Sequence, residues 1–158
     1  MKVVSDTSPI SYLILIGEAA LIEKLFGRVL IPPAVMAELL HGAAPASVRR
    51  EVAQRPQWLQ VVHVSPATED ASLASLHPGE REAIQLADLI AADLVVVDER
   101  KARRAALARG HQVAGLVGLL LRGAECGFVD LEDALARLQA TNFRLHPQLF
   151  ELIRQRHS

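Results

Sequence analysis

The run Leu94–Val97 is apolar at every position, and Asp98 follows it directly. A strand that is apolar on both faces has to be covered on both sides, which is the situation of strands in parallel sheets. Helix-like segments flank this run: Glu80–Ala92 has apolar residues at helical spacing, and Glu99–Arg109 is rich in Arg and Ala. A buried strand between two helices predicts a parallel sheet with helices on both faces.

The same alternation of strands and helices continues through the chain. Further strands are predicted in the residues before Asp6 and at Val29–Ile31, Leu59–Val64 and Gln112–Ala114. The remaining predicted helices are Ile10–Ile16, Glu18–Phe26, Ala34–Leu40, Pro45–Arg55, Gly115–Ala124, Leu131–Gln139 and Pro147–Arg156. We therefore expect an α/β fold with three α/β/α layers around a central parallel sheet of four to five short strands.

Length and composition narrow the class of protein. The 158 residues are expected to form a single domain over 1–158, with a helical C-terminal part from about residue 128. The net charge of −1 argues against a basic field over the whole molecule but not against a local basic patch. Cys126 is the only cysteine, which excludes an intramolecular disulfide. Apolar stretches are too short to span a bilayer, so we expect a cytoplasmic, soluble protein.

Acidic residues stand where the predicted strands end and where helices begin. Asp6 ends the first strand, Asp98 ends the fourth, and Glu38 lies one turn into the helix after the second strand. Glu80 and Glu82 open the helix before the fourth strand. Ligands of open α/β sheets bind at the carboxyl edge, so these carboxylates are candidates for one common site. Hard oxygen ligands that repel one another favour Mg²⁺ or Mn²⁺ as the cofactor.

Each of these acids also has an ordinary structural explanation. Glu80 and Glu82 could complement the dipole of their own helix. Glu38 could be an exposed helix residue, while Asp6 or Asp98 could cap the helix that follows it. The residues alone leave both interpretations open.

Four motifs, taken in order, resemble those of the PIN-domain superfamily. They are Val4-Ser5-Asp6-Thr7-Ser8-Pro9, Leu30-Ile31-Pro32-Pro33-Ala34-Val35 with Glu38 three residues on, Gly79-Glu80-Arg81-Glu82-Ala83-Ile84, and Val95-Val96-Val97-Asp98-Glu99-Arg100. The resemblance continues through Gly115-Leu116-Val117-Gly118 and covers most of the chain. The pattern is most similar to the uncharacterised prokaryotic PIN-like branch, which is related to the toxin ribonucleases of toxin–antitoxin systems.

This resemblance implies a Mg²⁺- or Mn²⁺-dependent endoribonuclease that hydrolyses RNA phosphodiester bonds and acts as a toxin. The implied catalytic acids are Asp6, Glu38, Glu82 and Asp98, and the implied metal ligands are these four together with Glu80. The third acid stays open between two residues. Glu82 followed by Ala83 matches the toxins, whereas the pair Glu80 and Glu82 resembles the paired glutamates of flap nucleases.

The resemblance has one departure. Many PIN toxins follow the fourth strand with Thr, any residue, then Asp, whereas this chain has Asp98 and Arg100 at those places. A fifth acidic ligand is therefore missing, and the main alternative is a weakly active or inactive PIN-like binding module that acts through a protein or RNA partner. A receiver-like phosphoacceptor domain is a third alternative, but it requires a Lys where Gly115 stands.

Basic residues gather on the predicted helix after Asp98. The candidate contacts with nucleic acid are Ser8, Arg100, Lys101, Arg103 and Arg104. A solvated helix face explains the basic residues equally well. Tyr12 and Trp58 are isolated in the sequence, so no base-stacking platform is predicted.

The C-terminal segments carry apolar residues that a small sheet would leave partly uncovered. These residues are Leu145, Leu149, Leu152 and Ile153. We therefore expect a homodimer, or a complex with an antitoxin protein, that buries part of them. RNA as substrate, an antitoxin and a second copy of the chain are the expected partners.

Overall fold

The computed structural model describes residues 1–63, 70–144 and 147–157, and, within α9, not the side chains of Leu149, Arg156 and His157. In these residues the sheet has five strands, all parallel, in the order β3-β2-β1-β4-β5. The strands are β1 (Val3–Ser5), β2 (Val29–Ile31), β3 (Leu59–Val61), β4 (Leu94–Val96) and β5 (Val113–Ala114). The predicted α/β fold with a parallel sheet of short strands is confirmed. Val64, the end predicted for the third strand, lies outside the described residues.

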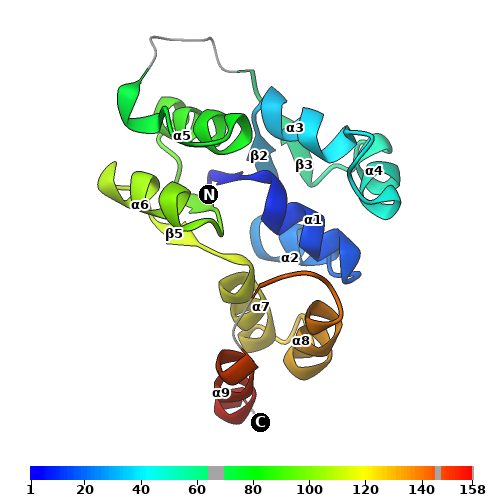
Figure 1. The fold of residues 1–158 in the computed structure, drawn as a ribbon. Coiled ribbons are helices and arrows are strands. Elements are labelled where there is room, and N and C mark those ends of the chain that lie inside the picture. Colours follow the sequence, from blue (N-terminus) through cyan, green and yellow to red (C-terminus); the bar gives the residue numbers. More distant parts are fainter. Residues whose placement is uncertain (64–69, 145–146, 158) are drawn as a thin grey trace.

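Helices connect the strands and cover the sheet (Figure 1). They are α1 (Thr7–Leu15), α2 (Ala20–Phe26), α3 (Pro33–Leu40), α4 (Ala46–Ala53), a 3₁₀ turn η1 (Ala71–Leu73), α5 (Pro78–Ile90), α6 (Arg100–Ala108), α7 (Leu116–Glu125), α8 (Leu131–Gln139) and α9 (Pro147–His157). The helices α7, α8 and α9 lie together at one end of the molecule, as Figure 1 shows. No helix in the described ranges is both long and apolar enough to cross a membrane.

Alternation along each strand divides the core into two layers. Val3 and Val96 face the layer that holds the apolar residues of α1, α2, α7 and α8. Val4 and Val95, one residue along in each strand, face the layer that holds α5 and α6. All four valines are at most 2% exposed, so β1 and β4 are buried on both faces, as their continuous apolar runs predict.

The strand order places a topological switch point between β1 and β4. The chain moves from β1 outward through β2 and β3, and then crosses back to β4 on the other side of β1. The backbone N–H of Asp6 donates to the carbonyl of Val96 at 3.0 Å, so the carboxyl ends of both strands reach the same edge. In open α/β sheets ligands bind at this kind of edge.

The described C-terminal residues bury more apolar surface than the sequence suggests. Phe150 and Ile153 of α9 belong to the larger core cluster, at 3% and 9% exposure. Leu152 is 61% exposed and is the one of the four apolar positions that is described as open to solvent. Leu145 and the side chain of Leu149 lie outside the described residues.

Candidate active site

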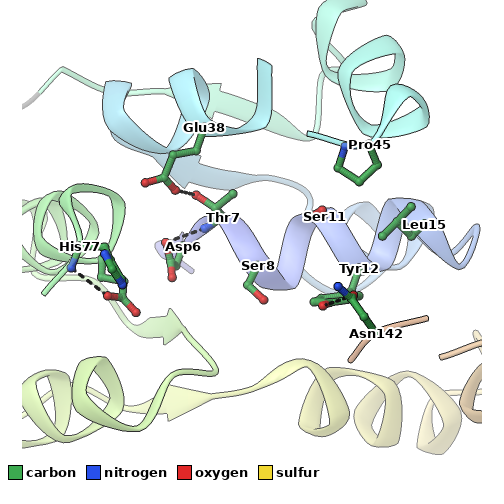
Figure 2. Close-up of a pocket in the computed structure, with 11 residues that line it drawn as sticks. Asp6, Thr7, Ser8, Ser11, Tyr12, Leu15, Glu38, Pro45, His77 and Asn142 are labelled. Carbon is green, nitrogen blue, oxygen red and sulfur yellow. Dashed lines mark hydrogen bonds between the residues drawn. The ribbon is translucent and has the colours of Figure 1, made fainter. Parts of the chain in front are cut away.

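The carboxyl edge of β1 opens into a pocket of about 460 Å³. Helix α1 forms one wall along its whole length, and α3, α5 and the loops that hold Pro45, His77 and Asn142 supply the rest. The lining side chains are Asp6, Thr7, Ser8, Ser11, Tyr12, Leu15, Glu38, Pro45, His77, Glu80 and Asn142. Figure 2 shows Asp6 and Glu38 at one end of the pocket, and Tyr12 with Asn142 further along α1. The pocket therefore has an acidic end and an aromatic, amide-bearing end.

Asp6 lies at the acidic end, between Glu38 and His77 in Figure 2. It is the N-cap of α1, and its Oδ1 accepts the Thr7 backbone N–H at 2.6 Å, so the helix begins at Thr7 rather than at the predicted Ile10. The residue is only 5% exposed. Burial raises the pKa of the Asp6 carboxyl from 3.8 to about 7, and the neighbouring charges of Glu80, Glu38 and Asp98 also raise it, against the lowering effect of the Thr7 hydrogen bond.

Glu38 reaches the pocket from the last turn of α3. Its Oε2 accepts a hydrogen bond from the Thr7 hydroxyl, and the residue is half-buried rather than an exposed helix position. The backbone of Gly79 lies directly behind this carboxylate, because a Cβ at Gly79 would come within 2.6 Å of Oε2. Thr7 and Gly79 together hold the Glu38 carboxylate beside Asp6.

The two glutamates at the start of α5 point to different places. Glu80 is 6% exposed, lines the pocket, and accepts the His77 backbone N–H at 3.0 Å through Oε1. Burial raises the pKa of the Glu80 carboxyl despite that hydrogen bond. The Oε1 of Glu82 instead accepts the backbone N–H of Ala34 at 3.2 Å, at the start of α3, and Glu82 does not line the pocket. Of the two glutamates, the structure brings Glu80 to Asp6.

Asp98 follows β4 and occupies the other side of the switch point. Its Oδ1 accepts the backbone N–H of Leu116 at 3.0 Å, while its Oδ2 is buried and has no hydrogen-bond partner among the described residues. Burial raises the pKa of the Asp98 carboxyl, whereas the Leu116 hydrogen bond and the charge of Arg103 lower it. Glu99, not Asp98, caps α6, since the Glu99 carboxylate accepts the Ala102 N–H at 3.0 Å.

The basic residues of α6 separate into two groups. Arg103 is half-buried; its Nη1 donates to the carbonyl of Val97 at 3.2 Å, beside Asp98. Arg100 is exposed, and Lys101 and Arg104 line a second pocket of about 440 Å³ between α6 and the turn η1. Arg103 is thus the basic residue of α6 whose charge acts on Asp98.

Arg109, at the end of α6, has a structural role. It forms ion pairs with Asp70 at 2.5 Å and with Asp88 at 2.7 Å, and so ties α6 to η1 and α5. Hydrogen bonds from Ser72 and Arg109 lower the pKa of Asp70 to about 2. The basic charge at this end of α6 is thus already paired.

The donor set at the acidic end suits a divalent metal bound partly through water. In the part of the chain that the structure describes, no three His, Cys, Asp or Glu side chains are arranged to hold a metal by themselves. Mg²⁺ usually keeps several waters and uses one or two carboxylates, so a closed cage is not required. The unpartnered Oδ2 of Asp98 and the raised pKa of Asp6 mark oxygens that a cation would satisfy.

Several residues of the pocket were not predicted from the sequence. Thr7 and Gly79 stand inside the quoted motifs, but their contact with Glu38 depends on the packing of α1, α3 and α5. Tyr12 lies one helical turn after Ser8, a spacing that could have placed both on one face of α1. Asn142 comes from a distant part of the chain, and no local sequence pattern indicates that it lines the pocket.

The comparisons identify the family to which the chain belongs. A search of curated proteins gives no match. The family model DUF3368, which is described as a PIN domain, matches residues 2–158. Members of this superfamily are generally nucleases, and they typically use divalent metals. The match covers nearly the whole chain, and the chain therefore belongs to the PIN-domain superfamily.

Proposed function

We propose that this protein is a Mg²⁺- or Mn²⁺-dependent endoribonuclease. The observation that carries the proposal is the meeting of Asp6, Glu38 and Glu80 in one pocket at the switch point, with the buried oxygen of Asp98 on the neighbouring strand. Four acids from different elements are costly to place together without a cation. The PIN family supports nuclease chemistry at this site, and RNA as the substrate rests on the resemblance to toxin ribonucleases.

In this proposal each residue of the site has a separate role. Asp6, Glu38 and Asp98, with Glu80 as the third acid in chain order, would hold the cation. A divalent cation in such a site stabilises charge at phosphorus and activates water. Thr7 orients Glu38 through its hydroxyl, and Arg103 supplies positive charge beside Asp98. Ser8 faces the pocket next to the acids, where it can donate to a phosphate oxygen.

Glu80→Gln is expected to lower Mn²⁺-dependent cleavage of RNA by about 10- to 100-fold, a typical loss when support of a metal is removed. Glu82→Gln is the matched control from the same helix, and it should leave cleavage nearly unchanged. Each Gln keeps an acceptor for the hydrogen bond that the glutamate makes, to His77 or to Ala34. Initial rates of cleavage of one RNA substrate are measured for both variants and for the wild type. A larger loss in Glu82→Gln would return the role of third acid to Glu82.

Gly115→Ala is expected to lower cleavage by about 10- to 100-fold, because a small displacement of a reacting group can have effects of that size. A Cβ at Gly115 would lie 2.6 Å from Asp98 Oδ1 and 2.8 Å from Arg103 Nη1. Gly118→Ala is the control on the same helix: its Cβ meets only Ala114 at 4.0 Å, and it should stabilise α7 by about 0.5–1 kcal/mol. Rates and melting temperatures separate the two effects. Equal rates in both variants would remove Asp98 from the site.

The alternative of a weakly active or inactive binding module has two observations in its favour. No three acids of the described residues form a ready metal cage, and Arg100 stands where many PIN toxins have an acid. A cleavage assay with purified protein, RNA, and Mn²⁺, Mg²⁺ or EDTA decides between the two functions. Metal-dependent cleavage supports the nuclease, whereas RNA binding without cleavage supports the module.

The toxin role and the protein partners are proposals that rest on the resemblance. We propose that the protein acts in the cytoplasm and is held by an antitoxin or forms a homodimer. Leu152, which is 61% exposed on α9, is an apolar side chain that such a partner would cover. Arrest of bacterial growth on induction of the chain, relieved by Asp6→Asn, would support the toxin role, and normal growth would contradict it.

A further inference from the structure

The pocket continues beyond the acids along one face of α1. Ser8, Ser11, Tyr12 and Leu15 follow one another at helical spacing and all line it. With a rise of about 1.5 Å per residue, Tyr12 lies roughly 7.5 Å along the helix axis from Thr7. The space past the acids is therefore large enough for a group attached to the reacting phosphate.

At the far end of the pocket, Tyr12 contacts both Asn142 and Phe143. The Tyr12 hydroxyl donates to Oδ1 of Asn142 at 2.6 Å, and the Tyr12 ring packs edge-to-face on Phe143, with centroids 5.0 Å apart at 80°. Burial raises the pKa of the Tyr12 hydroxyl, and the charge of Asp98 raises it further against the opposite effect of Arg144, so the hydroxyl stays a donor at neutral pH. The Tyr12 hydroxyl thus joins the ring to the side chain of Asn142, which is exposed and can be reached by a ligand.

This arrangement determines what the Asn142 amide can offer. The side-chain oxygen of Asn142 is engaged by Tyr12, whereas the amide N–H₂ carries two donors. An amide recognises adenine by donating and accepting at the same time. The Tyr12 hydroxyl takes one of the two lone pairs of that oxygen, so Asn142 has more donor than acceptor capacity left, which favours an edge that presents acceptors, such as the carbonyl groups of uracil or guanine. Leu15 and Pro45 add apolar surface against which a base can pack.

On the basis of the proposed nuclease function, we propose that Tyr12 and Asn142 form a nucleobase subsite beside the scissile phosphate, selective for a keto base over adenine. The substrate strand would then lie along α1, with its phosphate at the acids and one base at Asn142. Arg144, two residues after Asn142, is exposed and adds positive charge to this part of the chain.

Binding of fluorescein-labelled hexauridylate and hexaadenylate to the wild-type chain in EDTA, followed by fluorescence anisotropy, tests the subsite without requiring cleavage. The wild type is expected to bind hexauridylate about 5- to 10-fold more tightly, the value of one hydrogen bond. Asn142→Ala should bring the two affinities together. Tyr12→Phe should narrow the difference, because it frees the lone pair of the Asn142 oxygen that Tyr12 occupies and so raises the capacity of Asn142 to accept from adenine. Leu89→Ala, at a 65% exposed position on α5, is the control that should keep the wild-type preference.

The outcomes separate this inference from the nuclease proposal. Equal affinities in the wild type, no binding of either hexamer, or a preference that survives Asn142→Ala would overturn the subsite. A second experiment measures cleavage in the presence of Mn²⁺. Its RNA substrates differ from one another at one base beside the cleaved bond. Cleavage without base preference would leave the nuclease standing and remove the subsite. Preferential binding of hexauridylate without cleavage would support the subsite and contradict the nuclease proposal.

Discussion

Asp6→Asn is expected to lower metal-dependent RNA cleavage by ~100-fold or more, the size of loss that follows removal of an electrostatic contributor to a transition state. Asp6 is the acid on which the charges of Glu38, Glu80 and Asp98 converge. Asparagine keeps the shape of the side chain and is as good an N-cap as aspartate, so α1 should still begin at Thr7. The neutral amide binds Mg²⁺ more weakly, because a hard cation prefers an anionic oxygen.

Single-turnover rates at saturating protein, with a graded series of Mn²⁺ concentrations, measure this loss and show whether more metal recovers it. Glu125→Gln removes an acid from the exposed end of α7 and is the charge-matched control, which should keep the wild-type rate. Equal rates for wild type and Asp6→Asn would remove Asp6 from the metal site. No cleavage by either protein, with no stabilisation by Mn²⁺, would favour the inactive binding module.

Without divalent cations, the stability of the wild type is expected to fall as the pH rises from about 4 to about 7. The Asp6 carboxyl ionises near 3.8 when unfolded and near 7 when folded. Between these values the native state holds a proton that the unfolded state has released, so the free energy of unfolding decreases with pH and levels off above 7. A pKa shift of this size corresponds to a loss on the order of 4 kcal/mol.

Denaturant unfolding in EDTA at pH 5 and pH 8 measures this loss. Asp6→Asn should be less sensitive to pH and more stable than the wild type at pH 8, because it has no carboxyl to ionise at that position. The free energy of unfolding of the variant should still decrease with pH, but less steeply, since burial also raises the pKa of Glu80 and Asp98. Asp70 does not contribute to the change between pH 5 and pH 8. Its pKa is lowered from 3.8 to about 2, so its carboxyl is ionised in both the folded and the unfolded chain at these pH values. A wild type whose stability is unchanged or rises over this range would contradict the prediction.

Mn²⁺ should restore the stability that the wild type loses at high pH. A cation that binds only the native site stabilises it by mass action, and it does so most at pH 8, where Asp6 is ionised. The rise in melting temperature with Mn²⁺ should therefore be larger in the wild type than in Asp6→Asn. Identical shifts in the two proteins would place the bound Mn²⁺ elsewhere.

Local sequence signals were sufficient for most of the elements. The apolar runs 29–31 and 94–97 indicate strands because side chains on both faces of a parallel sheet are buried, and the structure has β2 and β4 there. The segment Leu131–Gln139 was predicted as a helix with the bounds that α8 has, from its apolar spacing. The errors fall at the ends of elements, and at α1 a side-chain cap decides where the helix begins. α1 begins three residues before the predicted Ile10 because Asp6 caps it.

By itself, the sequence determined which acids end strands and begin helices, and therefore that Asp6 and Asp98 belong to the carboxyl edge of a parallel sheet. Only the tertiary structure decided what each carboxylate faces. Glu80 and Glu82 carry equivalent local signals, and the packing of α5 against α3 directs Glu82 to Ala34 and Glu80 to the pocket. Asn142 reaches Tyr12 across 130 positions of chain. Periodicity and capping are properties of neighbouring residues, whereas a site depends on distances between elements that only the packed core defines.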